Sequence, residues 1–239
     1  MRYFSSFSLL LFGALSLAGC GAAPGKPLPG SEAQRPDQVL DFPILYQENC
    51  SACHGDQGRA GAAISLANPT YLTFAGSGNL ARITAKGVPG TMMPPFGQKS
   101  GGMLTDQQIQ VLTQGMLTRW SKPGEPLAVP YVKTLNGDAT QGQVAFVAKC
   151  SRCHGADATG SSTASPPTGS LVDPSYLALI SEQGLRSILV AGQPDEGMPG
   201  AAQLSDNLHP MTDQDVTNIV AWLTAHRSLT PGHPHPQHP

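Results

Sequence analysis

Cys50-Ser-Ala-Cys53-His54 and Cys150-Ser-Arg-Cys153-His154 are two copies of one pattern, Cys-x-x-Cys-His. Chance placement of the chain's cysteines and histidines predicts roughly 0.003 copies, so neither copy is accidental. The pattern is the attachment signature of c-type haem. Cysteines three residues apart lie on one face of a helix, where each can form a thioether with a haem vinyl group, and the histidine supplies a nitrogen to iron. The sequence therefore predicts two covalently attached haems c.

Two other uses of paired cysteines fit the sequence less well. A thioredoxin-like dithiol belongs to a βαβ pattern, and no strand rich in Val and Ile precedes either copy. The two cysteine pairs of a zinc ribbon lie about 15 to 20 residues apart, whereas Cys50 and Cys150 are separated by 100 positions. Both alternatives therefore rank below haem attachment.

The fifth cysteine, Cys20, ends an N-terminal segment typical of an export signal. Arg2 precedes an apolar run from about Phe4 to Leu17, and this run is short and interrupted by Ser and Gly. A bilayer core of about 30 Å needs about 20 apolar residues, so a transmembrane anchor is the weaker interpretation. Leu-Ala-Gly-Cys20 resembles the bacterial lipoprotein cleavage box. The resemblance implies that Cys20 becomes the lipidated first residue of an exported protein, anchored to a membrane and facing the periplasm or the cell exterior. An ordinary cleaved signal with an incidental cysteine is the alternative.

An internal repeat of about one hundred residues surrounds the two motifs. At a constant offset of 105, six positions of the first half match six of the second: Leu80, Ile83, Gly87, Pro89, Met93 and Pro94 correspond to Leu185, Ile188, Gly192, Pro194, Met198 and Pro199. Each half ends in a helical pattern with one tryptophan, Trp120 or Trp222. The repeat predicts two domains of the same fold.

Local signals mark the helices of each half. Asp41 and Asp138 are expected to cap helices that run into the two haem motifs. Thr105 and Gln108 have the spacing of a capping box, and Thr212 begins the corresponding helix of the second half. Between the helices the chain is rich in loops, since it contains 27 glycines and 22 prolines. Such small domains have little core of their own, and a bound prosthetic group is one way to supply buried apolar surface.

The predicted organisation is a signal peptide, a tether, a first domain, a linker, a second domain and a tail. Their expected boundaries are residues 1–20, 21–40, 41–121, 122–136, 137–228 and 229–239. Alternating prolines separate the histidines of the tail, which favours a solvated tail over a metal site. The first domain carries 5 basic and 4 acidic side chains over residues 41–120. The second carries 4 basic and 9 acidic side chains over residues 137–227. Either these are ordinary solvated surfaces, or the second domain docks on a basic partner.

Methionine is the candidate for the second axial ligand of each iron. The repeat selects among the methionines, because Met93 and Met198 fall at equivalent positions and each precedes a proline. Another methionine, or none, remains the alternative at each site. The remaining candidates after the signal segment are Met92, Met103, Met116 and Met211.

Over residues 41–227 the chain resembles the class I cytochromes c, in particular their tandem two-haem members. The residues that carry the resemblance are the two Cys-x-x-Cys-His motifs, the Gly-x-Pro-x-x-x-Met-Pro segments from Gly87 and Gly192, and the final helix of each half. The resemblance implies an all-α fold of two domains, each wrapped around one haem. It also implies that Cys50, Cys53, His54 and Met93 hold one haem, and Cys150, Cys153, His154 and Met198 the other. One departure is that Gly61-Ala-Ala stands where the family often has Gly-Pro, whose carbonyl holds the proximal histidine. That bond is therefore expected without an assigned partner.

With both axial positions filled, electron transfer is the expected function and catalysis is not. Redox proteins are the expected partners, such as a quinol-oxidising complex as donor and an oxidase, reductase or reaction centre as acceptor, and no nucleic acid is expected. One alternative is a subunit fixed in a larger respiratory or photosynthetic complex. Another is a catalytic two-haem enzyme of the peroxidase or thiosulfate dehydrogenase type. Neither ligand loop contains the extra His or Cys that such an enzyme would need.

Overall fold

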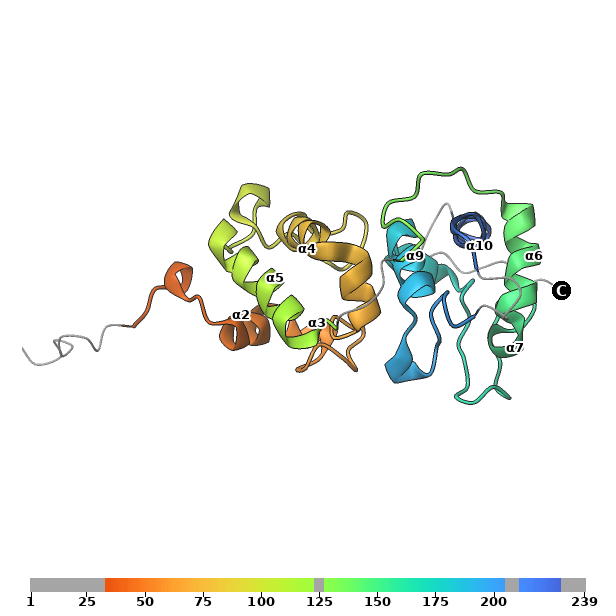
Figure 1. Ribbon diagram of the computed structural model, residues 1–239, viewed down its shortest axis with the longest axis horizontal. Helices are drawn as coiled ribbons and strands as arrows, with labels where there is room; N and C mark the ends of the chain where they lie inside the picture. Colours follow the sequence, from red (N-terminus) through yellow and green to blue (C-terminus); the bar gives the residue numbers. More distant parts are fainter. Residues whose placement is uncertain (1–32, 123–126, 205–210, 229–239) are drawn as a thin grey trace, which may run out of the picture. The chain divides into compact units, whose positions relative to one another are not determined.

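The computed structural model describes residues 33–122, 127–204 and 211–228 (Figure 1). The predicted signal segment with Cys20, most of the predicted tether, and the tail lie outside these ranges. Every named element in the described ranges is helical, which confirms the all-α prediction. None of the described helices is both long and apolar enough to cross a bilayer. Contacts divide the chain into residues 1–38, where η1 (Pro36–Gln38) lies, and one compact unit of residues 39–239.

The compact unit contains the helices of both predicted domains. The first half contributes α2 (Phe42–Asn49), α3 (Ser51–His54), α4 (Pro69–Lys86), η2 (Gln98–Ser100) and α5 (Asp106–Trp120). The second half contributes α6 (Ala139–Lys149), α7 (Ser151–His154), α8 (Pro174–Leu179), α9 (Glu182–Ala191), η3 (Pro194–Glu196) and α10 (Asp213–Ala225).

The expected helix caps are present. The Asp41 carboxylate accepts a hydrogen bond from Ile44 N at the start of α2, and Asp138 makes the equivalent contacts at the start of α6. At the start of α5 the Thr105 hydroxyl accepts from Gln108 N, and the Gln108 side chain accepts from Thr105 N, which completes the capping box. Thr212 begins α10 with the same reciprocal arrangement. These bonds satisfy amides that a helix leaves unpaired at its first turn.

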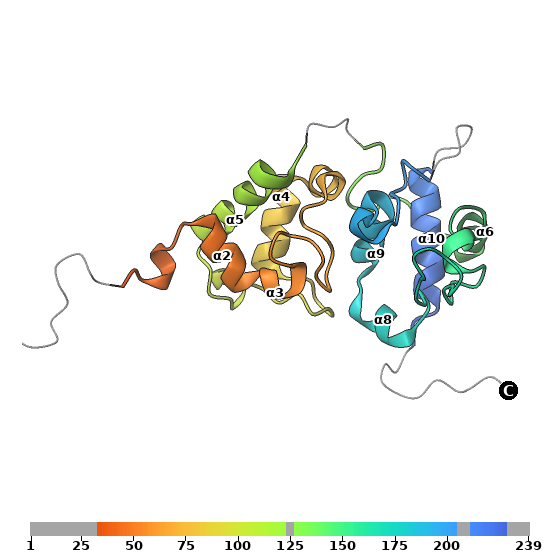
Figure 2. The same ribbon diagram turned by 90° about the horizontal axis from the view of Figure 1, so that it is seen from below.

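Each half packs its last helix between two others. α5 packs against α2 and α4, and α10 lies between α6 and α9 (Figures 1 and 2). The Trp120 ring meets the Phe42 and Tyr46 rings edge-on in the first half, and Trp222 packs on Phe146 with ring centroids 4.6 Å apart in the second. The two predicted tryptophans therefore pack the last helix of each half against the first.

Glycine permits a close helix crossing in the second half. At Gly142 of α6, an added Cβ would lie 2.0 Å from the Asn218 carbonyl oxygen of α10. Since real Cβ atoms do not come so close to a carbonyl, only glycine allows α6 and α10 to approach in this way.

The repeat also explains a break in the middle helices. α4 is kinked at Gly76, where φ is +67°, and the position 105 residues further is Ser181, which caps α9 after the end of α8. The two halves therefore turn the chain at equivalent positions, by a glycine in one and by a new helix start in the other.

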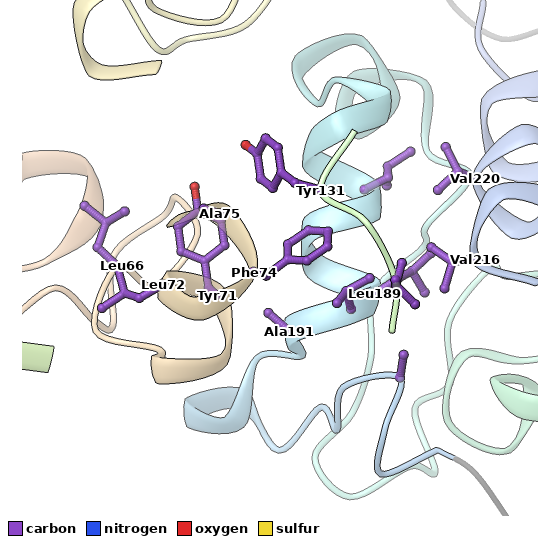
Figure 3. Close-up of a cluster of buried hydrophobic side chains, with 14 of the residues drawn as sticks. Leu66, Tyr71, Leu72, Phe74, Ala75, Tyr131, Leu189, Ala191, Val216 and Val220 are labelled. Carbon is purple, nitrogen blue, oxygen red and sulfur yellow. The ribbon is translucent and has the colours of Figure 1, made fainter. Parts of the chain in front are cut away.

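The two halves share apolar packing in which α4 contacts α9. The rings of Phe74 on α4 and of Tyr131 from the predicted linker lie 5.1 Å apart beside α9 (Figure 3). Val129 and Tyr131 are both buried. The end of the predicted linker is thus part of the core, which its proline content did not indicate.

Candidate haem-binding sites

The two Cys-x-x-Cys-His motifs adopt the same backbone conformation. Cys50 ends α2 with φ −125°, and α3 starts at the next residue as a single turn that ends at His54. Cys150 ends α6 and precedes α7 in the same way, with φ −120°. The motif is therefore a one-turn helix after a break, and not the continuation of one long helix. The turn is closed by helical hydrogen bonds to the residue four positions earlier. His54 N donates to Cys50 O and His154 N to Cys150 O, both at 3.0 Å.

The four motif cysteines all carry free thiols. The first cysteine of each pair is the more buried, and Cys53 and Cys153 are exposed. Burial, with a contribution from the charge of the neighbouring cysteine, raises the pKa of Cys50 to about 12 and the pKa of Cys150 to about 11. Without an attached group, these two sulfurs are therefore neutral thiols at pH 7.

The His54 imidazole is buried and fixed by one backbone contact. Its Nδ1 atom lies 2.8 Å from the carbonyl oxygen of Ile64. Because a carbonyl can only accept, Nδ1 carries the proton and Nε2 carries the free lone pair. Burial lowers the pKa of His54, partly offset by the Ile64 contact, so the ring is neutral at pH 7. The contact supplies the expected carbonyl partner of the proximal histidine, and its position could not be assigned from the sequence.

The His154 imidazole has a different environment. Its Nδ1 atom is buried and has no hydrogen-bond partner within the part of the chain that the structure describes. Burial lowers the pKa of this histidine as well. The loop that follows His154 pairs with itself, since Ser161 and Thr168 exchange backbone hydrogen bonds. The Thr168 hydroxyl also donates to Cys153 O.

Two glycine-hinged loops carry Met93 and Met198. Gly87 and Gly192 have φ +65° and +69°, and a Cβ on either would lie 2.6 Å from the carbonyl oxygen of the methionine in its own loop. Gln193 N and Met198 N each bond the other residue's carbonyl, at 2.9 and 3.0 Å, and Val88 N donates to Met93 O at 3.0 Å. Both halves therefore require glycine at the first position of the loop for the same steric reason.

The other candidate methionines have other environments. Met116 and Met211 are core residues with 3% and 6% of their surface exposed. Met92 and Met103 are exposed over 76% and 83% of theirs. Met93 and Met198 have intermediate exposure, with Met198 packed against the core. This is the pattern expected of a side chain at the border between the protein and a bound group.

The residues present fit haem c. Each half offers a pair of cysteines on one turn and a neutral imidazole directly after them. His54 is buried, and His154 is partly exposed. Among the described residues the buried Nδ1 of His154 has no hydrogen-bond partner, so this ring does not complete a hydrogen-bond network within that part of the chain. Soft sulfur and imidazole donors are those that bind haem iron.

Two family profiles match the chain, one in each half. Residues 37–114 match the family described as cytochrome c oxidase, cbb3-type, subunit III, and residues 139–226 match cytochrome c.

Among curated proteins, the chain is 27% identical over 145 residues to the cbb3-type cytochrome c oxidase subunit CcoP of Azospirillum sp. (strain B510), covering 54% of this chain and 45% of that protein. It is 30% identical over 122 residues to a probable tape measure protein of Escherichia phage Mu, covering 49% of this chain and 15% of that protein. The chain thus spans less than half the length of the curated relatives it matches. A solved structure, the Kuenenia stuttgartiensis reducing HAO-like protein complex, contains a chain with a TM-score of 0.48 and 14% identity, covering 82% of this chain and 100% of that one.

Proposed function

The chain is a class I cytochrome c with two cytochrome c domains in tandem, and from this premise we propose that it transfers single electrons through two haems c. When bound, haem c supplies one reversible electron through its iron. Cys50 and Cys53 attach the first haem through thioethers, and Cys150 and Cys153 attach the second. His54 and His154 bind the two irons through Nε2.

Met93 and Met198 are proposed to complete the two coordination spheres. The observation that carries this proposal is the matching pair of glycine-hinged loops. A Cβ added at Gly87 or Gly192 would lie 2.6 Å from the carbonyl oxygen of the methionine in the same loop. With His54 and Met93 holding one iron, and His154 and Met198 the other, neither haem would keep an open position for a substrate. Such sites exchange electrons without making bonds, and the methionine raises the potential.

A redox titration of the purified holoprotein, followed by absorption spectroscopy, tests this function. We expect two haems per chain, both six-coordinate with methionine, and no binding of carbon monoxide to the reduced protein. Tight binding of carbon monoxide at either iron would instead support a two-haem enzyme. Cys150→Ser should lower the haem content from two to one and Cys50→Ser likewise, because each motif is complete in itself.

The chain is proposed to be exported and anchored to a membrane through lipid on Cys20. This rests on the Leu-Ala-Gly-Cys20 segment and on the similarity to a subunit named for a cbb3-type oxidase. Two or more acyl chains give stable attachment at about 0.8 kcal/mol per buried methylene. Mass spectrometry of the mature N-terminus and fractionation of Cys20→Ser test it. We expect Cys20→Ser to leave the membrane fraction, and an unmodified Cys20 in the wild type would contradict the proposal.

The proposed partners are a quinol-oxidising complex as donor and an oxidase, reductase or reaction centre as acceptor. A fixed subunit of an oxidase-like complex is the second candidate function, which the similarity of the first half to an oxidase subunit favours. Purification after mild solubilisation distinguishes the two. Stoichiometric recovery with other subunits supports a fixed subunit, and recovery alone supports a carrier.

A further inference from the structure

Asn68 is a buried side chain, 3% exposed, that contacts both halves of the molecule. Its Oδ1 atom caps α4 by accepting from Thr70 N and Tyr71 N, 3.0 and 3.3 Å away. Its Nδ2 atom donates to the carbonyl oxygens of Ala191 and Gly192, both at 3.1 Å. The side chain amide thus uses its acceptor in the first domain and its donors in the second.

The two carbonyls that Asn68 binds lie where α9 ends and the Met198 loop begins. The last carbonyls of a helix have no partner within the helix and need one from elsewhere. Gly192 is also the hinge of the loop, and its backbone conformation brings the chain against the Met198 carbonyl. Asn68 therefore fixes the direction in which the chain leaves α9 toward Met198.

A second contact from the first domain reaches the middle of the same loop. Asp195 lies in η3, between the hinge and Met198. The Ser65 hydroxyl is 3.2 Å from its carboxylate, and the Arg59 guanidinium is 3.9 Å from it. The first domain thus contacts the loop at its start through Asn68 and at its centre through Ser65 and Arg59.

The internal repeat shows that capping alone does not account for Asn68. The position 105 residues further is Asp173, which caps α8 through Ser175 N and Tyr176 N, both at 2.9 Å. Asp173 is exposed, and a carboxylate has no hydrogen to donate. Asp and Asn cap helices about equally well. The donor group that distinguishes Asn68 from its counterpart is the one that bonds the second domain.

We propose that Asn68 is a positioning residue for the Met198 loop, so that a side chain of the first domain sets the strength of methionine ligation at the second haem. The inference rests on the proposed function, since it assumes that Met198 binds iron. It makes the two domains a coupled unit and not two independent carriers joined by a linker.

The test compares Asn68→Ser with Asp173→Ser in the full-length holoprotein. Serine caps helices well and is too short to replace the amide bridge. The background is Met93→Ala, in which Met198 provides the only methionine-ligated iron. Two readouts are used: the methionine-to-iron charge-transfer absorption of the oxidised protein, and the imidazole concentration that abolishes this absorption. The second readout reports the Met198 site alone, because the first iron is already open in this background.

In the Met93→Ala background, Asn68→Ser should weaken the charge-transfer absorption and raise the imidazole affinity of the second haem by about tenfold, since the loop loses two hydrogen bonds. Asp173→Ser should change neither.

If Asn68→Ser hinders haem incorporation, Asn68→Asp is used in its place. Aspartate keeps the cap of α4 and the shape of the side chain but cannot donate to the carbonyls of Ala191 and Gly192, so it is compared with Asp173→Ser in the same way. Loss of the second haem alone is the extreme form of the expected result. Equal effects of the Asn68 and Asp173 variants, or no effect of either, would overturn the inference. Absence of the charge-transfer absorption from the Met93→Ala parent would instead refute the ligation on which the proposed function depends.

Discussion

The Nδ1 atom of His54 lies 2.8 Å from the carbonyl oxygen of Ile64, ten residues further along the chain. This contact fixes both the tautomer and the orientation of the ring. It also increases the basicity of Nε2, the nitrogen proposed to bind iron, as such outer contacts do at other metal sites. The Nδ1 atom of His154 has no partner among the described residues. The two proposed haem sites therefore differ in the donor strength of their histidines.

This asymmetry predicts that the first haem has the lower potential, because a stronger donor favours Fe(III). A hydrogen bond of about 1 kcal/mol corresponds to about 40 mV in a one-electron couple. The greater negative charge of the second domain acts in the opposite direction, but salt screens the part of it that lies on exposed side chains. A titration at 0.5 M salt should therefore resolve two steps. Met198→Ala should remove the higher one, and a single step or the reverse order would contradict the prediction.

Met93→Ala and Met198→Ala should each open one iron to external ligands. The haem stays attached, because the thioethers are on another segment of the chain. The reduced Met93→Ala protein should bind one carbon monoxide per chain, and the double variant should bind two. Met103→Ala, at a residue exposed over 83% of its surface, is the control and should behave as the wild type. Unchanged spectra in both single variants would reject the ligand assignment.

Gly192→Ala should displace the Met198 loop. The added Cβ would lie 2.6 Å from Met198 O, and φ +69° with ψ −179° is a region that only glycine occupies readily. We expect a loss of about 1–3 kcal/mol in unfolding free energy and weaker ligation at the second haem alone. Gly90→Ala is the control, because its φ is also positive but an added Cβ has no neighbour within 4 Å. Equal losses of ligation in the two variants would show that backbone strain, and not the collision, is responsible.

The features that were predictable from the sequence depend on residues close together in the chain. The caps at Asp41 and Asp138 and the box formed by Thr105 and Gln108 need only three or four residues to form. The repeat also located the equivalent hinge glycines, because both loops meet the same steric requirement. The haem motifs were recognisable for the same reason, although the backbone break at Cys50 was not predicted.

The features that were missed join distant segments. Asn68 binds a carbonyl 124 residues away, and no local pattern distinguishes it from an ordinary helix cap. The carbonyl partner of His54 comes from Ile64, and any residue can offer a carbonyl. Tyr131 was assigned to a linker because of its neighbouring prolines, but it is buried against Phe74. Long-range packing decided each of these positions.

Arg186 provides the clearest test of how the linker is held. Its guanidinium is 2% exposed and donates to Pro130 O at 2.7 Å, to Tyr131 O at 3.2 Å and to the Thr217 hydroxyl at 3.1 Å, and it pairs with Asp213. Removal of one partner from a buried ion pair costs about 3–5 kcal/mol, because the other partner stays buried without its counter-charge. Arg186→Leu should therefore lower the unfolding free energy by about that amount.

The linker offers a matched control for Arg186→Leu. Lys133 pairs with Glu182 at 2.8 Å, but both side chains are largely exposed, and such pairs contribute at most about 1 kcal/mol. Urea unfolding of the holoprotein, with slopes compared as well as midpoints, measures both variants. Lys133→Met should shift the midpoint little, whereas Arg186→Leu should shift it strongly. If the two shifts were alike, the Pro130–Tyr131 segment would not depend on the buried guanidinium, and its burial would have to be ascribed to the packing of Tyr131 on Phe74 alone.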